Sequence, residues 1–313
     1  MIFSPNEGDS KRVTAGEPIL DLPPLEGALS RVYAFLDVDD PIVAWAVYRC
    51  VLVSANAEFT PPQCPISMMF AGIVCNQNNI RLRNELLIEK YRQLHFPHCN
   101  SRLTGMYFFE DRQSAERVQR APEWGGGHFC SENLAELLFF SSAPISRYDS
   151  NWITFAPREQ SGKISDEGWI KNYWSGEPFP EKEPLWELVA QGRAVVCGAD
   201  IRVRAYETVH SHFPEAVSLL EIARIAAHVG SDLGHLSAWL IRNEDASLDL
   251  RYHIDMRDAD NPVFLDKVRR YSGPRNERDL AVGGDHFGIP HFEKCKCEFN
   301  VTDEFLLSVH GNK

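Results

Sequence analysis

The stretch SRLTGMYFFED, residues 101–111, sets three aromatic side chains in succession between a glycine and an acidic pair. Aromatic residues are enriched in strands, so the stretch predicts one. The sequence that follows predicts a short helix over residues 111–120. The stretch also raises a functional question, which is whether its rings only fill the core or one of them lies against a flat ligand.

The bulk composition predicts a globular protein with a sizeable core. The chain has 313 residues, of which 44% are hydrophobic and 24% charged, as in one large domain or two modest ones. The net charge of −12 argues against a general nucleic-acid binder, which would carry a basic surface.

Several features predict a cytoplasmic protein with no membrane partner. No apolar run approaches the roughly 20 residues that a membrane helix needs. The N-terminus lacks the pattern of a signal peptide. The eight cysteines mostly sit beside apolar residues, as reduced thiols do, and they form no C-x-x-C pair.

Two segments have the periodicity of helices. NNIRLRNELLIEKYRQL, residues 78–94, places apolar residues at helical spacing and a charged stripe beside them, formed by Arg81, Glu85, Glu89 and Arg92. FPEAVSLLEIARIAAHVG, residues 213–230, is nearly all apolar with one polar seam, which predicts a buried helix in which Glu221 and Arg224 can pair. DEGWIKNYWSG, residues 166–176, predicts a shorter helix closed by Gly176.

Other segments have the composition of strands. These are residues 42–55 (IVAWAVYRCVLVSA), LLFF at 137–140, NWITF at 151–155, 193–207 (RAVVCGADIRVRAYE) and 247–255 (SLDLRYHID). PLWELVAQG, residues 184–192, fits a helix opened by Pro184 or a strand with alternating apolar residues, and the sequence leaves both readings open.

The common catalytic and metal-binding motifs give no match. His95, His98 and Cys99 lie close together, but only Cys295 and Cys297, about two hundred residues away, could complete a zinc site, so we expect no metal. The chain has no G-x-S-x-G, no P-loop and no Rossmann glycine pattern. YWSGE, residues 173–177, is expected to pack against the core rather than to line a pocket.

The opening stretch, followed by QSAERV, resembles a segment of the ADP-ribosyltransferase superfamily. In that family a strand of the type G-x-Y-F, then an acidic residue and a small-residue helix, lines the nicotinamide pocket. VYRC at 47–50 resembles the family's first strand, and residues 134–155 resemble a following strand and loop. WELVAQGRAVV, residues 186–196, resembles the late strand that opens with the catalytic glutamate.

The resemblance implies a fold of the α+β class, with a split mixed β-sheet like the ADP-ribosyltransferase core and a C-terminal helix and strand extension. From its polar and proline-containing sequence we expect an N-terminal arm over residues 1–30, followed by the core that resembles the family over 31–210 and an extension packed on the core over 211–313. A second pattern, R-x-x-x-E…FP…SRL, is similar to one in bacterial proteins, and here it comprises Arg81, Glu85, Lys90–Arg92, Phe96–Pro97 and Ser101–Leu103.

The resemblance to ADP-ribosyltransferases also implies a chemistry. NAD would be the co-substrate, and its ADP-ribose would pass to a protein, a nucleic acid or water. Tyr107 would stack on the nicotinamide, Glu187 would be the catalytic carboxylate and Arg49 would orient NAD. Ser101 and Arg102 would also bind NAD. No E-x-E pattern precedes Glu187, which disfavours the subclass that modifies guanidines.

Each of these assignments has an ordinary structural alternative. Tyr107 can be a core ring with its hydroxyl satisfied, Glu187 an exposed residue of a short helix and Arg49 a charge at a strand edge. The chain would then be a non-enzymatic interaction protein whose acidic surface binds a basic protein partner. A third reading is a small-molecule binding domain without catalysis.

Overall fold

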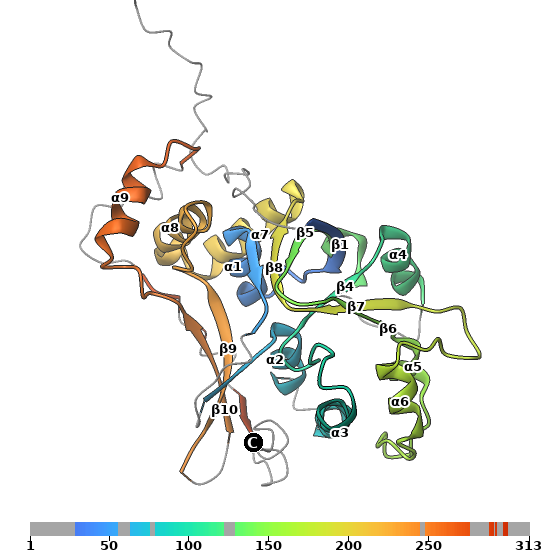
Figure 1. The fold of residues 1–313 in the computed structure, drawn as a ribbon. Helices are drawn as coiled ribbons and strands as arrows, with labels where there is room; N and C mark the ends of the chain where they lie inside the picture. The colour runs from blue at the N-terminus through green and yellow to red at the C-terminus, as the bar shows by residue number, and fades with distance from the viewer. Residues whose placement is uncertain are drawn as a thin grey trace, which may run out of the picture.

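The structure, a computed structural model, describes residues 29–55, 63–75, 79–121, 129–244, 248–275, 288–290, 292 and 297–299. Within these residues the chain is a mixed α and β protein (Figure 1). The strands are β1 (Leu29–Phe35), β2 (Val51–Val53), β3 (Gln63–Ile66), β4 (Met106–Phe109), β5 (Leu134–Ser141), β6 (Ser146–Asp149), β7 (Trp186–Ala190), β8 (Gly192–Val196), β9 (Leu236–Arg242), β10 (Leu248–Ile254) and β11 (Cys297–Phe299).

The helices connect these strands. They are α1 (Pro41–Arg49), α2 (Met68–Cys75), α3 (Asn79–His95), α4 (Arg112–Arg120), α5 (Asn151–Phe155), α6 (Gly168–Trp174), α7 (Ala199–His212), α8 (Val217–His228) and α9 (Pro262–Arg270), with short 3-10 helices at Ser131–Asn133 and Pro214–Ala216. The expectation of an α+β protein is confirmed at this level.

The strands form two sheets. A seven-stranded sheet has the order β2-β8-β5-β1-β4-β7-β6, and a four-stranded sheet has the order β11-β10-β9-β3. All the strand pairs described are antiparallel, where a mixed sheet was expected. Strands that are far apart in the chain also pair in this way: β1 and β5 are antiparallel neighbours although α1 to α4 lie between them in the sequence.

One face of the larger sheet is covered by α1, α7 and α8 (Figure 1). Side chains of these helices share one buried cluster with the inward-facing residues of β1, β4, β5, β7 and β8. The buried helix expected over residues 213–230 is present as α8, and its Glu221 accepts from Arg224 at 2.9 Å. This layer is the main hydrophobic core.

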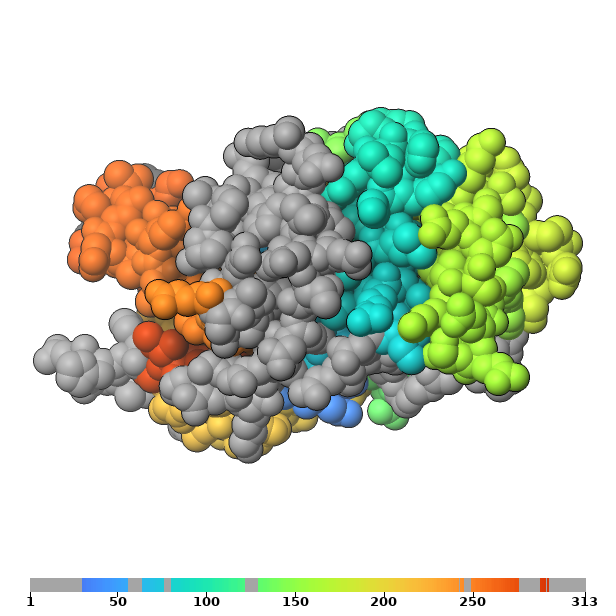
Figure 2. Space-filling view, turned by 90° about the horizontal axis from the view of Figure 1, so that it is seen from below, coloured from blue at the N-terminus to red at the C-terminus, as the bar shows by residue number. Residues whose placement is uncertain are grey.

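The opposite face is covered near β4, β7 and β6 by α3, α5 and α6. In Figure 2 the cyan and teal segment that contains α3 lies against the yellow-green segment of α5 and α6. The buried side chains here are largely aromatic: Tyr148, Trp152, Trp169, Tyr173, Trp174 and Phe179. The other side of α3 contributes Leu82 and Leu86 to a separate cluster with the small sheet.

A buried aspartate fixes the approach to β7. Asp149 is fully buried, and its Oδ1 accepts hydrogen bonds from the backbone N–H groups of Asn151 at 3.0 Å and Leu185 at 2.9 Å. Its Oδ2 accepts from the N–H of Phe179 at 2.8 Å. Because Leu185 directly precedes β7, this carboxylate fixes the start of the strand that carries Glu187.

The opening stretch forms the strand and helix that its sequence predicts. Its residues 106–109 are β4, which lies between β1 and β7, with Tyr33 opposite Phe109 and Tyr107 opposite Val189. Asp111 caps α4 by accepting from the N–H of Ser114 at 2.7 Å. The helices expected at 78–94 and 166–176 are also present, and the second is followed by Gly176 at φ +76°.

The strand expected over residues 42–55 is wrong for most of its length. Residues 41–49 form α1, and only Val51–Val53 form a strand. Local capping explains the difference, because Asp40 accepts from the N–H of Ile42 at 2.8 Å and Pro41 stands in the first turn. These signals outweigh the strand propensity of the apolar residues that follow, so VYRC closes a helix instead of forming a first strand.

Two further strand predictions are corrected. NWITF forms α5, and only the first part of residues 193–207 is a strand, since α7 begins at Ala199. Gly198 is the N-cap residue of α7. The ambiguous segment at 184–192 contains a strand, β7, because its alternating residues pair with β4 on one side and β6 on the other.

The division of the chain at residues 30 and 210 remains a prediction. Residues 1–28 of the expected arm lie outside the described residues, as does Cys295 of the C-x-C pair. Strand β3, from the expected core, pairs with β9 of the expected extension. In the described part of the chain, no helix is long and apolar enough to cross a membrane and no cluster of ligand side chains could hold a metal.

Candidate functional site

Three of the predicted site residues, Arg102, Tyr107 and Glu187, meet in one polar cluster. Arg102 lies in the turn between α3 and β4, Tyr107 on β4 and Glu187 on the neighbouring strand β7. The Nη1 of Arg102 donates to Glu187 Oε1 at 2.7 Å, and the hydroxyl of Tyr107 donates to the backbone carbonyl of Arg102 at 2.7 Å. We call this group, together with Glu85 and Tyr173, the Arg102 cluster.

Glu85 of α3 was not predicted as a site residue. Its Oε2 accepts from Arg102 Nε at 2.8 Å and its Oε1 from Nη2 at 3.1 Å, which is the paired geometry of a guanidinium with a carboxylate. Glu85 is 2% exposed and Arg102 is 3% exposed. The ion pair therefore lies inside the protein, between α3 and the larger sheet.

Tyr173 of α6 closes the cluster from the aromatic layer. Its hydroxyl accepts from Arg102 Nη1 at 2.6 Å and donates to Glu187 Oε1 at 2.7 Å. The centre of the Arg102 guanidinium lies 5.0 Å from the ring centroid of Tyr107 and 5.4 Å from that of Tyr173. The guanidinium is thus flanked by two rings and two carboxylates.

Glu187 and Tyr107 are the two members of the cluster that are only partly buried, and Glu187 is the partly buried carboxylate. Its side chain is 12% exposed, whereas that of Arg102 is 4% exposed. Both of its hydrogen bonds are made by Oε1. Among the described residues no donor reaches Oε2, so that oxygen can accept a proton or a hydrogen bond from another molecule.

The environments of the two glutamates move their pKa values in opposite directions. Burial raises the pKa of Glu187, although Arg102 and the Tyr173 hydroxyl act to lower it. Burial also acts to raise the pKa of Glu85, but the charge and hydrogen bonds of Arg102 outweigh it and lower that pKa. Two carboxyls with separated pKa values can hold different protonation states at one pH.

The remaining members of the cluster do not exchange protons near neutral pH. Burial raises the pKa of Tyr107 and of Tyr173 well above the usual value, so both hydroxyls stay neutral. Burial disfavours the charge of Arg102, but Glu85 and the other acidic neighbours keep its pKa high and the guanidinium charged. Of the two carboxyls, Glu187 is the one whose pKa is raised and Glu85 the one whose pKa is lowered.

Ser101 shapes the turn and does not join the cluster. Its Oγ accepts from the N–H of Leu103 at 3.0 Å, and its carbonyl accepts from the N–H of Gly105 at 2.9 Å. A Cβ on Gly105 would lie 2.8 Å from that same carbonyl oxygen, which explains the glycine. The role of Ser101 here is to hold the loop that carries Arg102.

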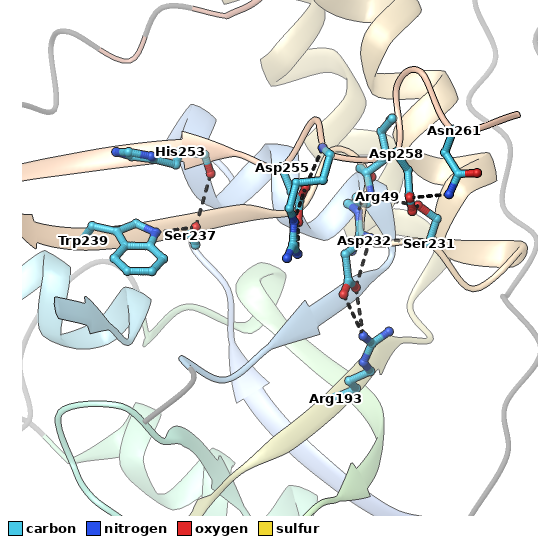
Figure 3. Close-up of polar contacts among 12 residues, drawn as sticks. Arg49, Arg193, Ser231, Asp232, Ser237, Trp239, His253, Asp255, Asp258 and Asn261 are labelled. Atoms are coloured by element: carbon cyan, nitrogen blue, oxygen red, sulfur yellow. Dashed lines mark hydrogen bonds and ion pairs between the residues drawn. The ribbon is translucent and has the colours of Figure 1, made fainter. Parts of the chain in front are cut away.

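Arg49 lies elsewhere in the fold (Figure 3). It ends α1 just before β2, and four strands separate β2 from β7 in the sheet order. Its guanidinium is 1% exposed and donates to the backbone carbonyls of Ser231 at 3.0 Å, Leu233 at 3.3 Å and Val51 at 3.3 Å. Arg49 therefore fastens α1 to the loop before β9 and does not reach Glu187.

A surface ion pair adjoins Arg49. Asp232 lies 4.0 Å from Arg49 Nη2 and accepts from Arg193 Nη2 at 2.9 and 3.0 Å (Figure 3). Burial is the main cause that lowers the pKa of Arg49, to about 10, and that of His235, to about 4. These residues join the end of α1 to the loop before β9.

The Arg102 cluster can supply a carboxyl that gives or takes a proton, or a carboxylate that stabilises a nearby positive charge. Glu85 and Tyr173 were not predicted as site residues; one sequence signal could have found the first, since the pattern R-x-x-x-E…SRL contains both Glu85 and Arg102. No protein-family model matches this chain, and no curated protein matches it either.

Proposed function

We propose that the protein uses NAD and transfers its ADP-ribose to an acceptor, or to water, at the Arg102 cluster. One observation carries the proposal: Arg102 and Tyr107, which the resemblance to ADP-ribosyltransferases selects in one stretch, share a hydrogen-bonded cluster with Glu187, which it selects 85 positions after Arg102. Arg49, which the same resemblance selects, makes its contacts elsewhere and is left out of the proposed site.

The proposed reaction breaks the bond between the nicotinamide nitrogen and the ribose, and the electron pair leaves with nicotinamide. The ribose carbon becomes positively charged in the transition state, and the Glu187 carboxylate stabilises that charge. An acceptor hydroxyl or water then forms the new bond to that carbon, and its proton passes to the carboxylate. Oε2, which no described residue binds, is the oxygen available for both steps.

The other residues of the cluster would position this carboxylate. Arg102 and Tyr173 hold Oε1, so Oε2 keeps one orientation. Tyr107 holds the backbone of Arg102 and presents a half-buried ring at the same place. A carboxylate held in advance stabilises a developing charge without the cost of reorienting during the reaction.

The test measures nicotinamide released from NAD by the full chain, detected by mass. Glu187→Gln keeps the shape of the side chain and removes the charge, and we expect the rate to fall about 100-fold or more. Glu181→Gln is the matched control, because Glu181 is exposed in the loop that precedes β7, and its rate should equal that of the wild type. Absence of nicotinamide release by the wild type, or equal rates in the two variants, would refute the proposal.

A second candidate is an interaction protein in which the Arg102 cluster only holds the fold together. The observation that favours it is that Nε, Nη1 and Nη2 of Arg102 all have acceptors within the protein. In that case NAD leaves the melting temperature unchanged, and Glu187→Gln changes stability alone. A basic protein partner would then be captured in a manner that weakens with added salt.

A further inference from the structure

The orientation of Arg102 is set from the side opposite Glu187. Arg102 donates from Nε and Nη2 to the carboxylate of Glu85, at 2.8 and 3.1 Å. Its Nη1 donates to Glu187 Oε1 at 2.7 Å and to the Tyr173 hydroxyl at 2.6 Å. A guanidinium is planar, so fixing two of its nitrogens fixes the direction of the third. Glu85 thus determines where Nη1 points without touching Glu187.

Glu85 also limits the charge that Glu187 meets. The groups that face Glu187 are Arg102 from the turn before β4, Tyr173 from α6, Tyr107 from β4 and Tyr148, which lies opposite it on β6. Arg102 is the one cation that faces Glu187 within the described part of the chain, and the tyrosines are neutral. The negative charge of Glu85 offsets that cation, while Arg81 and Arg158 act on Glu85 from exposed positions.

We propose that Glu85 is a positioning residue for Glu187: through Arg102 it aims Nη1 at Oε1, and it cancels enough of the guanidinium charge for the Glu187 carboxyl to exchange a proton. Glu85 itself touches no reacting atom. The chemical role assigned to Glu187 rests on the proposed function, but the control of its protonation by Glu85 does not.

Removal of the Glu85 charge has a defined effect on Glu187. Glu85→Gln removes the offsetting charge, so the full charge of Arg102 acts on Glu187, and Glu187 should titrate at lower pH. Loosening of the cluster would also hydrate Glu187 and lower its pKa, because burial is the main cause that raises it, so a second variant has to separate charge from loosening. Glu85→Asp keeps the charge, so we expect it to restore most of the wild-type midpoint.

The experiment follows the side-chain carboxyl carbons of the full chain, labelled with ¹³C-glutamate, by NMR from pH 3 to 8. The Glu187 signal is identified by its loss in Glu187→Gln. Its midpoint should move to lower pH in Glu85→Gln and return toward the wild-type value in Glu85→Asp. Glu89→Gln is the matched control, because Glu89 is equally buried on α3 at 2% exposed but is bound by Arg92 instead of Arg102, and it should move the midpoint less.

Two results would overturn the proposal. One is a Glu187 midpoint that stays in place or rises in Glu85→Gln while circular dichroism reports an intact fold. The other is an equal downward movement in Glu85→Gln and Glu85→Asp, which would mean that the charge of Glu85 is not the cause. The titration requires no NAD, so failure of the nicotinamide assay with the expected titration refutes the proposed function alone, and the reverse outcome refutes this inference alone.

Discussion

Arg102 and Glu187 are 85 positions apart in the chain, yet Nη1 and Oε1 lie 2.7 Å apart inside the protein. The contact joins the turn between α3 and β4 to the strand β7, and Glu85 extends it to α3. The guanidinium of Arg102 therefore joins α3, the turn before β4 and β7. Burial of an ion pair does not by itself add stability, but loss of one partner leaves the other charge without compensation.

Replacement of Arg102 should strongly destabilise the fold. Arg102→Met leaves Glu85 and Glu187 buried without a cation, and we expect the free energy of unfolding to fall by about 3–5 kcal/mol. Urea denaturation monitored by circular dichroism measures it. Arg120→Met is the comparison, because Arg120 is 77% exposed in its pair with Glu116 and should cost no more than about 1 kcal/mol. Equal losses in the two variants would contradict the importance of the buried pair.

The protonation of Glu187 should make stability depend on pH. Burial raises its folded pKa above the usual 4.5, so its stabilising contribution is full below pH 4.5 and is lost as the pH rises through the folded pKa. Glu187→Gln cannot lose a proton there. The free energy of unfolding of this variant, relative to wild type, should therefore rise from pH 4.5 toward neutrality, as measured by urea denaturation at several pH values.

The matched variant Glu181→Gln should instead run parallel to wild type over the same range, because its side chain is exposed. A difference curve for Glu187→Gln that is flat with pH would mean that Glu187 titrates alike in the folded and unfolded chains. A curve that falls with pH would mean that its folded pKa is lowered.

Arg49 is expected to matter for stability and not for catalysis. Arg49→Met removes the donors to the carbonyls of Ser231 and Leu233 and should lower the free energy of unfolding by about 2–4 kcal/mol. Nicotinamide release, measured at a temperature where the variant stays folded, should be unchanged per folded molecule. If Arg49→Met lowered that rate as much as Glu187→Gln does, Arg49 would belong to the catalytic site after all.

His235 should make the protein sensitive to acid. Burial, and next the charge of Arg49, lower its pKa from 6.5 to about 4. Its contribution is therefore present above pH 6.5 and is lost as the pH falls toward 4, with a slope of at most about 1.4 kcal/mol per pH unit. His235→Asn should flatten the unfolding free energy over this range, whereas His98→Asn, at an exposed position, should keep the wild-type slope. If the unfolding free energies of the two variants changed equally with pH, His235 would not be the cause of the acid sensitivity.

The sequence predicts best where local signals and burial agree. The strand β4 and the helices α3, α4 and α8 follow from aromatic content, periodicity and capping. Residues 41–49 and 151–155 were predicted as strands because they are rich in aromatic and β-branched residues. In the first case the helix cap at Asp40 outweighs the strand propensity of residues 41–49. Composition alone does not show whether a cap or a strand propensity will dominate.

The candidate site was harder to predict because its members interact across the fold. Tyr107, Arg102 and Glu187 were selected by resemblance, and nothing in their spacing states that they touch. Glu85 was placed on a charged stripe of α3 and in the pattern R-x-x-x-E…SRL but not in the site, and such stripes usually face water. Here Glu85 turns inward because Arg102, 17 positions later, supplies the charge that allows a carboxylate to be buried.

The position of α3 between two packed clusters has a mechanical consequence. One side of the helix places Leu82 and Leu86 against the small sheet, and another places Ile88 in the aromatic layer. Protein interiors are close-packed, so a rigid helix cannot shift at one contact without displacing the side chains at the other. A displacement of β9 or β10 is therefore expected to move the side chains packed around Leu82 and Leu86, and with them the helix that carries Glu85.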